Sequence, residues 1–258
     1  MNLLHTLLNF DYYRPQLMDI FGASTNTKVH DVLFEYYSNP NKISNPELFE
    51  RYLFALSQNS NPPDSIVRKY VEILEKKPKF SSSQDQKCKQ TFLLSLATLS
   101  RKSLDVSLKS SVLKFLVQEL LQCQSPECKQ EHLRALKNTE NSIVVPILIK
   151  LIESRETDSK SALLAIEILS SQFDFEILKT KIKNLDQHLL TLLKDPEKEV
   201  SLKSEIIEMM LKFYPTMENV KEIFQMVKNS ANKELIALSV QKWMDLAENI
   251  PTVRDLFR

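Results

Sequence analysis

Residues 45–58 read NPELFERYLFALSQ, and this stretch decides the fold class of the protein. It opens with an asparagine that suits a helix N-cap, followed by a proline, which is favoured at the first helical position. Its apolar residues then recur at helical spacing, at Leu48, Phe49, Tyr52, Leu53 and Leu56. The same pattern returns far along the chain, at Ile206, Ile207, Met210, Leu211 and Tyr214. Such stripes are typical of amphipathic helices that bury one face.

The 258 residues contain a single glycine, Gly22. Average composition would give roughly 7% glycine. Hairpin turns, strand bulges and phosphate-binding loops depend on glycine, because they need a positive φ or close backbone approach. The sequence therefore predicts an all-α protein without a phosphate-binding loop or a nucleophile elbow.

Helix start signals divide the chain into regular segments. Asn45, Ser125 and Asp195 each precede a proline and a glutamate, which predicts an N-cap followed by a first helical turn. Further N-caps are predicted at Asp64, Ser107, Ser142 and Thr157. The predicted helices span residues 26–38, 45–58, 64–77, 85–102, 107–123, 126–138, 142–153, 157–172, 175–194, 196–213, 217–229 and 233–248.

Alternate predicted helices begin about 40 residues apart, and a two-helix repeat of this length is the signature of an α-solenoid. The short turns make consecutive helices antiparallel neighbours. We therefore predict a right-handed α-solenoid, a two-layer helical horseshoe of about six antiparallel helix pairs. We expect it to form a single domain over residues 1–258.

Charge and hydropathy exclude several classes of partner. The net charge of +1 argues against general attraction to nucleic acid. No stretch approaches the roughly 18 unbroken apolar residues that predict a membrane-spanning helix. Residues 1–10 are apolar but lack the basic region and cleavage site of a signal peptide. We expect neither a transmembrane segment nor a signal peptide in this sequence.

Residues that carry chemistry are sparse. The four histidines, His5, His30, His132 and His188, are scattered and lack partners at metal-ligand spacing. His132 follows Cys128 by one helical turn, but a metal site needs a third ligand and the sequence shows none nearby. The sequence favours a solvated or capped His132, and it predicts no catalytic residue, no metal and no cofactor.

Cys123 and Cys128 form a pair across a helix boundary, because Pro126 opens the next predicted helix. Such a turn can bring two Cβ atoms within disulfide reach, and it leaves Cys88 as a free thiol. The spacing alone is equally compatible with two reduced cysteines in a cytosolic helical repeat. The spacing therefore does not decide between a disulfide and two free thiols.

Residues 50–55 (ERYLFA), 66–69 (IVRK) and the later helices resemble the helical domain of the large lipid transfer protein family. This family includes vitellogenin, apolipophorin, apolipoprotein B and the large subunit of the microsomal triglyceride transfer protein. The resemblance covers about residues 30–258, and its most specific residues are Ala135, Leu136, Lys137, Asn138 and, eight positions later, Pro146. In the family, an Ala-Leu-Lys-Asn turn leads into a proline-initiated helix in this way. The microsomal protein also carries a similar cysteine pair just upstream.

The resemblance implies a helical horseshoe that cradles lipid-binding sheets and docks protein disulfide isomerase in the endoplasmic reticulum lumen or secretory pathway. That compartment is oxidising, so the resemblance implies a Cys123–Cys128 disulfide. We expect the family's β-barrel and lipid-cavity sheets to be absent from this chain, so that neutral lipid or phospholipid is bound through those missing sheets. We also expect uncovered apolar surface along one helix layer.

A cytosolic adaptor of the HEAT or armadillo type, with free thiols throughout, is the alternative interpretation. Both interpretations describe a binding scaffold rather than an enzyme, since no catalytic constellation stands out in the sequence.

Overall fold

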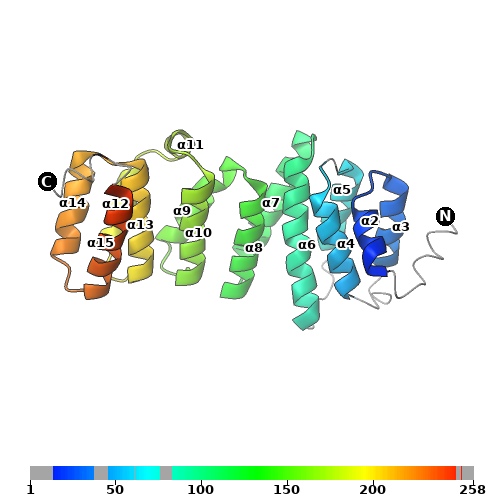
Figure 1. Ribbon diagram of the computed structural model, residues 1–258, viewed down its shortest axis with the longest axis horizontal. Helices are drawn as coiled ribbons and strands as arrows, with labels where there is room; N and C mark the ends of the chain where they lie inside the picture. The colour runs from blue at the N-terminus through cyan, green and yellow to red at the C-terminus, as the bar shows by residue number, and fades with distance from the viewer. Residues whose placement is uncertain (1–13, 38–45, 61, 76–82, 248–250, 252–258) are drawn as a thin grey trace. The chain divides into compact units, whose positions relative to one another are not determined.

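The computed structural model describes residues 14–37, 46–60, 62–75, 83–247 and 251, and these are helices joined by short turns (Figure 1). The described residues contain no β-strand, which confirms the predicted all-α class. Within them, every helix is too short or too polar to span a lipid bilayer. The chain forms two compact units, residues 1–140 and 141–258.

The helices of the first unit alternate between two layers. They are α2 (Arg14–Gly22), α3 (Thr27–Tyr37), α4 (Pro46–Gln58), α5 (Asp64–Glu75), α6 (Ser83–Lys102), α7 (Val106–Gln122) and α8 (Pro126–Thr139). In one layer α2 packs on α4, α4 on α6 and α6 on α8 (Figure 1). In the other, α3 packs on α5 and α5 on α7. Consecutive helices of this unit therefore lie in opposite layers.

The core of this unit is made by the apolar stripes of its helices. Tyr52, Leu53 and Leu56, from the stretch that decides the fold class, are fully buried. The rings of Tyr70 in α5 and Phe92 in α6 lie 4.6 Å apart between centroids, which packs the two layers together. Burial of such side chains is the main force that holds amphipathic helices in place.

Gly22 lies where α2 approaches α4. A Cβ atom on this residue would sit 2.5 Å from the Cβ atom of Ala55 and 2.7 Å from the backbone nitrogen of Leu56. Its φ is not positive, so it is not a turn glycine. The one glycine of the chain therefore serves close helix packing.

The second unit contains a short 3₁₀ helix and seven α-helices among its described residues. They are η2 (Ser142–Val144), α9 (Val145–Glu153), α10 (Ser159–Gln172), α11 (Phe175–Lys181), α12 (Leu185–Lys194), α13 (Val200–Phe213), α14 (Met217–Lys228) and α15 (Lys233–Ala247). α13 is central, since it packs on α10, α12, α14 and α15. Its predicted stripe is buried at Ile206, Ile207, Met210 and Leu211.

Three helix predictions differ from the structure. Predicted helix 175–194 is broken into α11 and α12, because Asn184 adopts a left-handed conformation with φ of 58°. Pro196 lies in a turn, where the Asp195 carboxylate accepts from the Glu197 amide at 3.0 Å, and α13 begins only at Val200. The helix α2 has no counterpart among the helices predicted from the sequence.

Helix caps were located only approximately by the sequence. Ser125 is confirmed as the N-cap of α8. The structure places the N-caps of α7 and α10 at Asp105 and Asp158 rather than at Ser107 and Thr157. In both cases a nearby aspartate provides the cap, and its carboxylate is an acceptor at least as favourable as the hydroxyl.

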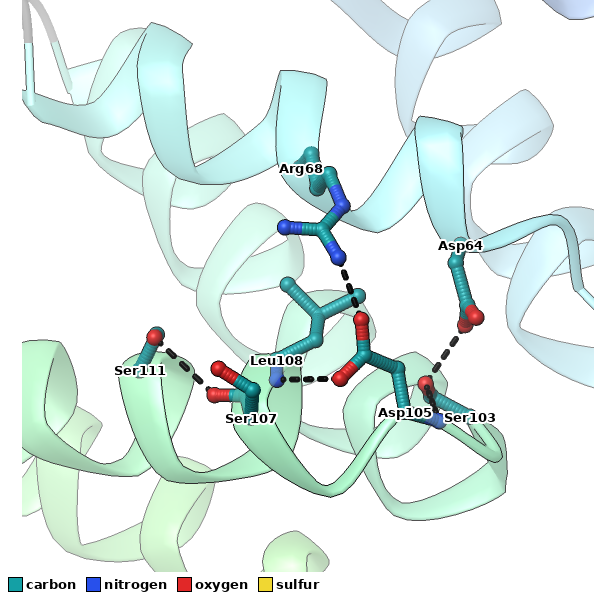
Figure 2. A network of polar contacts seen from close by, with 7 residues as sticks. All are labelled: Asp64, Arg68, Ser103, Asp105, Ser107, Leu108 and Ser111. Atoms are coloured by element: carbon teal, nitrogen blue, oxygen red, sulfur yellow. Dashed lines mark hydrogen bonds and ion pairs between the residues drawn. The ribbon is translucent and has the colours of Figure 1, made fainter.

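Figure 2 shows how the turn between α6 and α7 is tied to α5. Asp105 accepts from the Leu108 amide at 3.0 Å and forms an ion pair with Arg68 of α5. The Ser103 hydroxyl donates to Asp64 and accepts from the Asp105 amide. One aspartate thus caps its own helix and joins it to the first turns of α5.

Candidate functional site

The turn between α7 and α8 brings the predicted cysteine pair together. Cys123 is the C-cap of α7, and its amide donates to the Leu120 carbonyl at 3.2 Å. Ser125 starts α8 by accepting from the Cys128 amide at 3.2 Å, and Pro126 fixes the first helical position. The chain therefore reverses direction over very few residues. Cys123 lies at the end of α7 and Cys128 in the first turn of α8, so the two side chains face each other across the turn.

The structure joins Cys123 to Cys128 by a disulfide, with their Cα atoms 5.6 Å apart. Cys123 is buried and Cys128 is partly exposed. The bond connects the end of α7 to the first turn of α8, which also pack on each other. A loop this short limits the unfolded chain only slightly, so the bond acts mainly on the geometry of the turn. The oxidation state of the protein in its own compartment stays a prediction.

His132 completes a cluster with the two cysteines. Its Nδ1 atom lies 2.9 Å from the Cys128 carbonyl oxygen, 3.4 Å from Cys123 Sγ and 3.8 Å from Cys128 Sγ. The carbonyl oxygen can only accept, so Nδ1 carries the proton and donates it toward the carbonyl and the sulfurs. The side chain is 1% exposed, so the expectation of a solvated His132 is wrong.

Burial keeps His132 neutral. It lowers the pKa of the imidazole, because the charged form would lose its hydration. Lys89 lowers this pKa further, whereas the Cys128 carbonyl and the Glu119 carboxylate raise it. Nε2 has no hydrogen-bond partner among the described residues. The histidine is therefore a neutral N–H donor that bonds the Cys128 carbonyl oxygen and lies near both sulfur atoms.

The same three residues offer three metal-ligand atoms within 4.8 Å of one another. The approach of Cys123 to His132 has no signature in the sequence spacing, because the two residues lie on opposite sides of the turn. A bonded disulfide leaves neither sulfur as a thiolate ligand. A metal-bound histidine also usually passes its second ring N–H to an acceptor, and Nε2 has none among the described residues. The cluster thus fits sulfur chemistry better than metal binding.

The residues on which the family resemblance rests pack helices or define helix ends in this structure. Ala135 and Leu136 are fully buried in α8, and the Lys137 carbonyl accepts from the Glu140 amide at the helix end. Asn138 donates to the Thr98 hydroxyl of α6 at 3.4 Å. Pro146 is exposed in the first turn of α9, as expected of a helix-starting proline. The four residues Ala135 to Asn138 form the last turn of α8 and not the turn that follows it.

The other two histidines among the described residues do not join a metal-type cluster. His30 is buried between Tyr52 and the Ser24 carbonyl, both 2.7 Å away. His188 is exposed and pairs with Glu153. The prediction for His5 lies outside the described residues. Across the described chain, no second group of three His, Cys, Asp or Glu side chains has metal-site spacing.

Comparison with known proteins gives no family assignment, since no family model and no curated protein matches this sequence.

Proposed function

We propose that this chain is the helical scaffold of a lipid transfer protein. In this proposal it supports a lipid cavity completed by partner β-sheets, and it docks a protein such as protein disulfide isomerase in the endoplasmic reticulum lumen or secretory pathway. It carries out no catalytic step of its own. The proposal rests on the resemblance in sequence, on the packing within each unit and on the cysteine pair.

Polar contacts within each unit support a solenoid. In the first unit Arg101 pairs with Glu140, 39 residues along the chain, and Ser103 bonds Asp64, also 39 residues away. In the second unit Lys198 donates to the Ser154 carbonyl, 44 residues away. In the first unit these contacts join helices that are next but one along the chain, and in the second unit the contact joins the end of α9 to the turn before α13. A separation of about 40 residues is expected for stacked helix pairs. The proposed right-handed horseshoe extends this pattern.

The disulfide is the observation that favours a secretory scaffold over a cytosolic adaptor. A cytosolic adaptor would keep Cys123 and Cys128 reduced, whereas an oxidising lumen favours the bond that the α7–α8 turn accommodates. The pair also lies just before the Ala135–Asn138 motif, where the microsomal member of the lipid transfer family carries a similar pair.

The surface corrects one expectation about lipid contact. Apolar side chains exposed by more than half include Phe54 of α4 and Leu121 of α7, which belong to different layers. Ile20 of α2 is a further example in the first of these layers. The exposed apolar side chains therefore do not follow one layer. In the proposal, lipid contact belongs to the partner sheets and not to a continuous apolar face of this chain.

Isolation of the protein from its own cells tests the proposal. An antibody against residues 83–140 would recover it under mild conditions, and mass spectrometry would quantify the lipids and proteins recovered with it. We expect neutral lipid or phospholipid above the level recovered with an unrelated secretory protein, together with protein disulfide isomerase. Recovery without lipid enrichment, with both cysteines reduced, would favour the cytosolic adaptor.

A further inference from the structure

The two sulfur atoms of the disulfide are not equivalent. Cys123 is 8% exposed, whereas Cys128 is partly exposed in the first turn of α8. The proton-bearing Nδ1 atom of His132 lies 3.4 Å from Cys123 Sγ and 3.8 Å from Cys128 Sγ. Cys128 is therefore the more solvent-exposed of the two residues, and the buried N–H donor lies closer to the sulfur of Cys123.

This asymmetry matters for exchange with thiols. A thiolate that attacks a disulfide bonds to one sulfur and expels the other as a thiolate. Accessibility selects the sulfur that is attacked, and the leaving sulfur departs faster when its thiol has a lower pKa. A nearby hydrogen-bond donor stabilises the departing thiolate. At this turn the more exposed cysteine is Cys128, and the sulfur nearest the donor belongs to Cys123.

We propose that the Cys123–Cys128 disulfide is a covalent modification site for small thiols of the glutathione class. An incoming thiolate attacks Cys128 Sγ and forms a mixed disulfide there. The bonding electron pair of the protein disulfide leaves with Cys123 Sγ, and the N–H group of His132 stabilises that thiolate. One S–S bond forms and one breaks, so this step changes no overall oxidation state. A second small thiolate can then attack the mixed disulfide, which releases Cys128 and forms the oxidised small thiol.

This proposal depends only on the α7–α8 turn, with its disulfide and His132. It does not rest on lipid transfer, so a failure of the lipid test leaves it standing. Lys89 and Glu119 are the charged groups that act on His132, and they do so in opposite directions. The donor is the neutral imidazole.

The site of attack can be mapped directly. The Cys88→Ser variant removes the third cysteine and leaves the pair. It is treated with reduced glutathione, and free thiols are then blocked with N-ethylmaleimide at acidic pH before peptide mass spectrometry. We expect glutathione on Cys128 and maleimide on Cys123, with at least about tenfold selectivity. Equal labelling, preference for Cys123, or labelling only after denaturation in urea overturns the proposal.

The role of His132 has its own measurement. His132→Leu removes the donor, and we expect the glutathione reaction to slow roughly tenfold, because the departing Cys123 thiolate loses the N–H group that stabilises it. His132→Asn places an amide N–H near the position of Nδ1 and is expected to restore much of the rate. The exposed His188→Leu variant is the matched control and should react like the parent. Equal rates for all four folded proteins, with folding checked by circular dichroism, contradict the assigned role.

Discussion

Replacing Gly22 with alanine would place a methyl group in space that α4 already fills. The new Cβ atom would lie 2.5 Å from Ala55 Cβ and 2.7 Å from the Leu56 backbone nitrogen, which cannot move without shifting the helix. We expect a loss of about 1–3 kcal/mol in the free energy of unfolding, typical of overpacking. Urea unfolding followed by circular dichroism measures it.

Ala23→Ser is the matched control, because Ala23 is adjacent and exposed. This change should stay within about 0.5 kcal/mol of the parent protein. If Gly22→Ala is equally mild, α2 does not approach α4 as closely as the structure shows.

His30 predicts a pH dependence of stability. Burial lowers its pKa, and the neutral ring donates from Nε2 to the Ser24 carbonyl and accepts the Tyr52 hydroxyl proton at Nδ1. The unfolded chain, with a histidine pKa of about 6.5, takes up the proton first as the pH falls. The contribution of neutral His30 is therefore complete above about pH 6.5 and is lost as the pH falls toward the folded-state pKa.

The His30→Gln variant separates this contribution from that of His132, whose pKa is also lowered. Denaturant midpoints measured from about pH 8 down to about pH 5 should fall less steeply in the variant than in the parent. At the upper end of the range the variant should be less stable by about 1–3 kcal/mol, because Tyr52 loses this acceptor. Parallel pH curves would show that His30 does not titrate as described.

At the scale of an element, Asp105 has two functions at the start of α7. It caps the Leu108 amide and pairs with Arg68, whose side chain is largely exposed. Asp105→Ala should cost about 1–2 kcal/mol, most of it from the lost cap. Asp105→Asn keeps a cap acceptor and should recover most of that loss, since an exposed ion pair contributes only about 0–1 kcal/mol. Thermal unfolding of both variants measures the difference.

Arg68→Ala is the counterpart of these variants. It removes the ion pair and leaves the cap, so its effect should be smaller than that of Asp105→Ala. The reverse order would mean that the contact between α5 and α7 depends on charge more than on capping.

Periodicity and capping residues located most helices to within a few residues, because both signals are local. Asn184 was missed as a helix break, since an asparagine inside an apolar pattern has no distinctive signature until its φ is known. Pro196 misled the prediction because an aspartate before a proline also begins an ordinary turn. The cysteine pair was found by spacing. The approach of His132 to Cys123 was not, although the one-turn spacing of Cys128 and His132 indicated the cluster.

At the scale of the whole molecule, each unit contains the same lysine contact. Lys102 donates to the Ser57 and Asn59 carbonyls at the end of α4, at 2.6 and 2.9 Å. Lys198 donates to the Ile152 and Ser154 carbonyls at the end of α9, at 2.9 and 3.3 Å. In both places an ammonium group satisfies carbonyls that a helix end leaves without an intrahelical partner.

Because each lysine acts inside one compact unit, we expect the effects of substitution to be local. Lys102→Met should raise hydrogen exchange in α4 and α6, and Lys198→Met should raise it in α9 and α13. Each change should cost about 1.5–3 kcal/mol locally, as expected for hydrogen bonds from a charged donor. Mass-spectrometric hydrogen exchange measures this, and equal loosening of both units by either substitution would show that they do not respond separately.

An oxidised helical scaffold bridged at the α7–α8 turn requires a bond between two sulfur atoms in the cell. Protein from its native cells should be alkylated at harvest, digested without reductant and mapped by peptide mass spectrometry. We expect one linked peptide pair joining Cys123 to Cys128, with Cys88 alkylated. Alkylation of both Cys123 and Cys128 would rule out the oxidised scaffold and would support the reduced cytosolic adaptor.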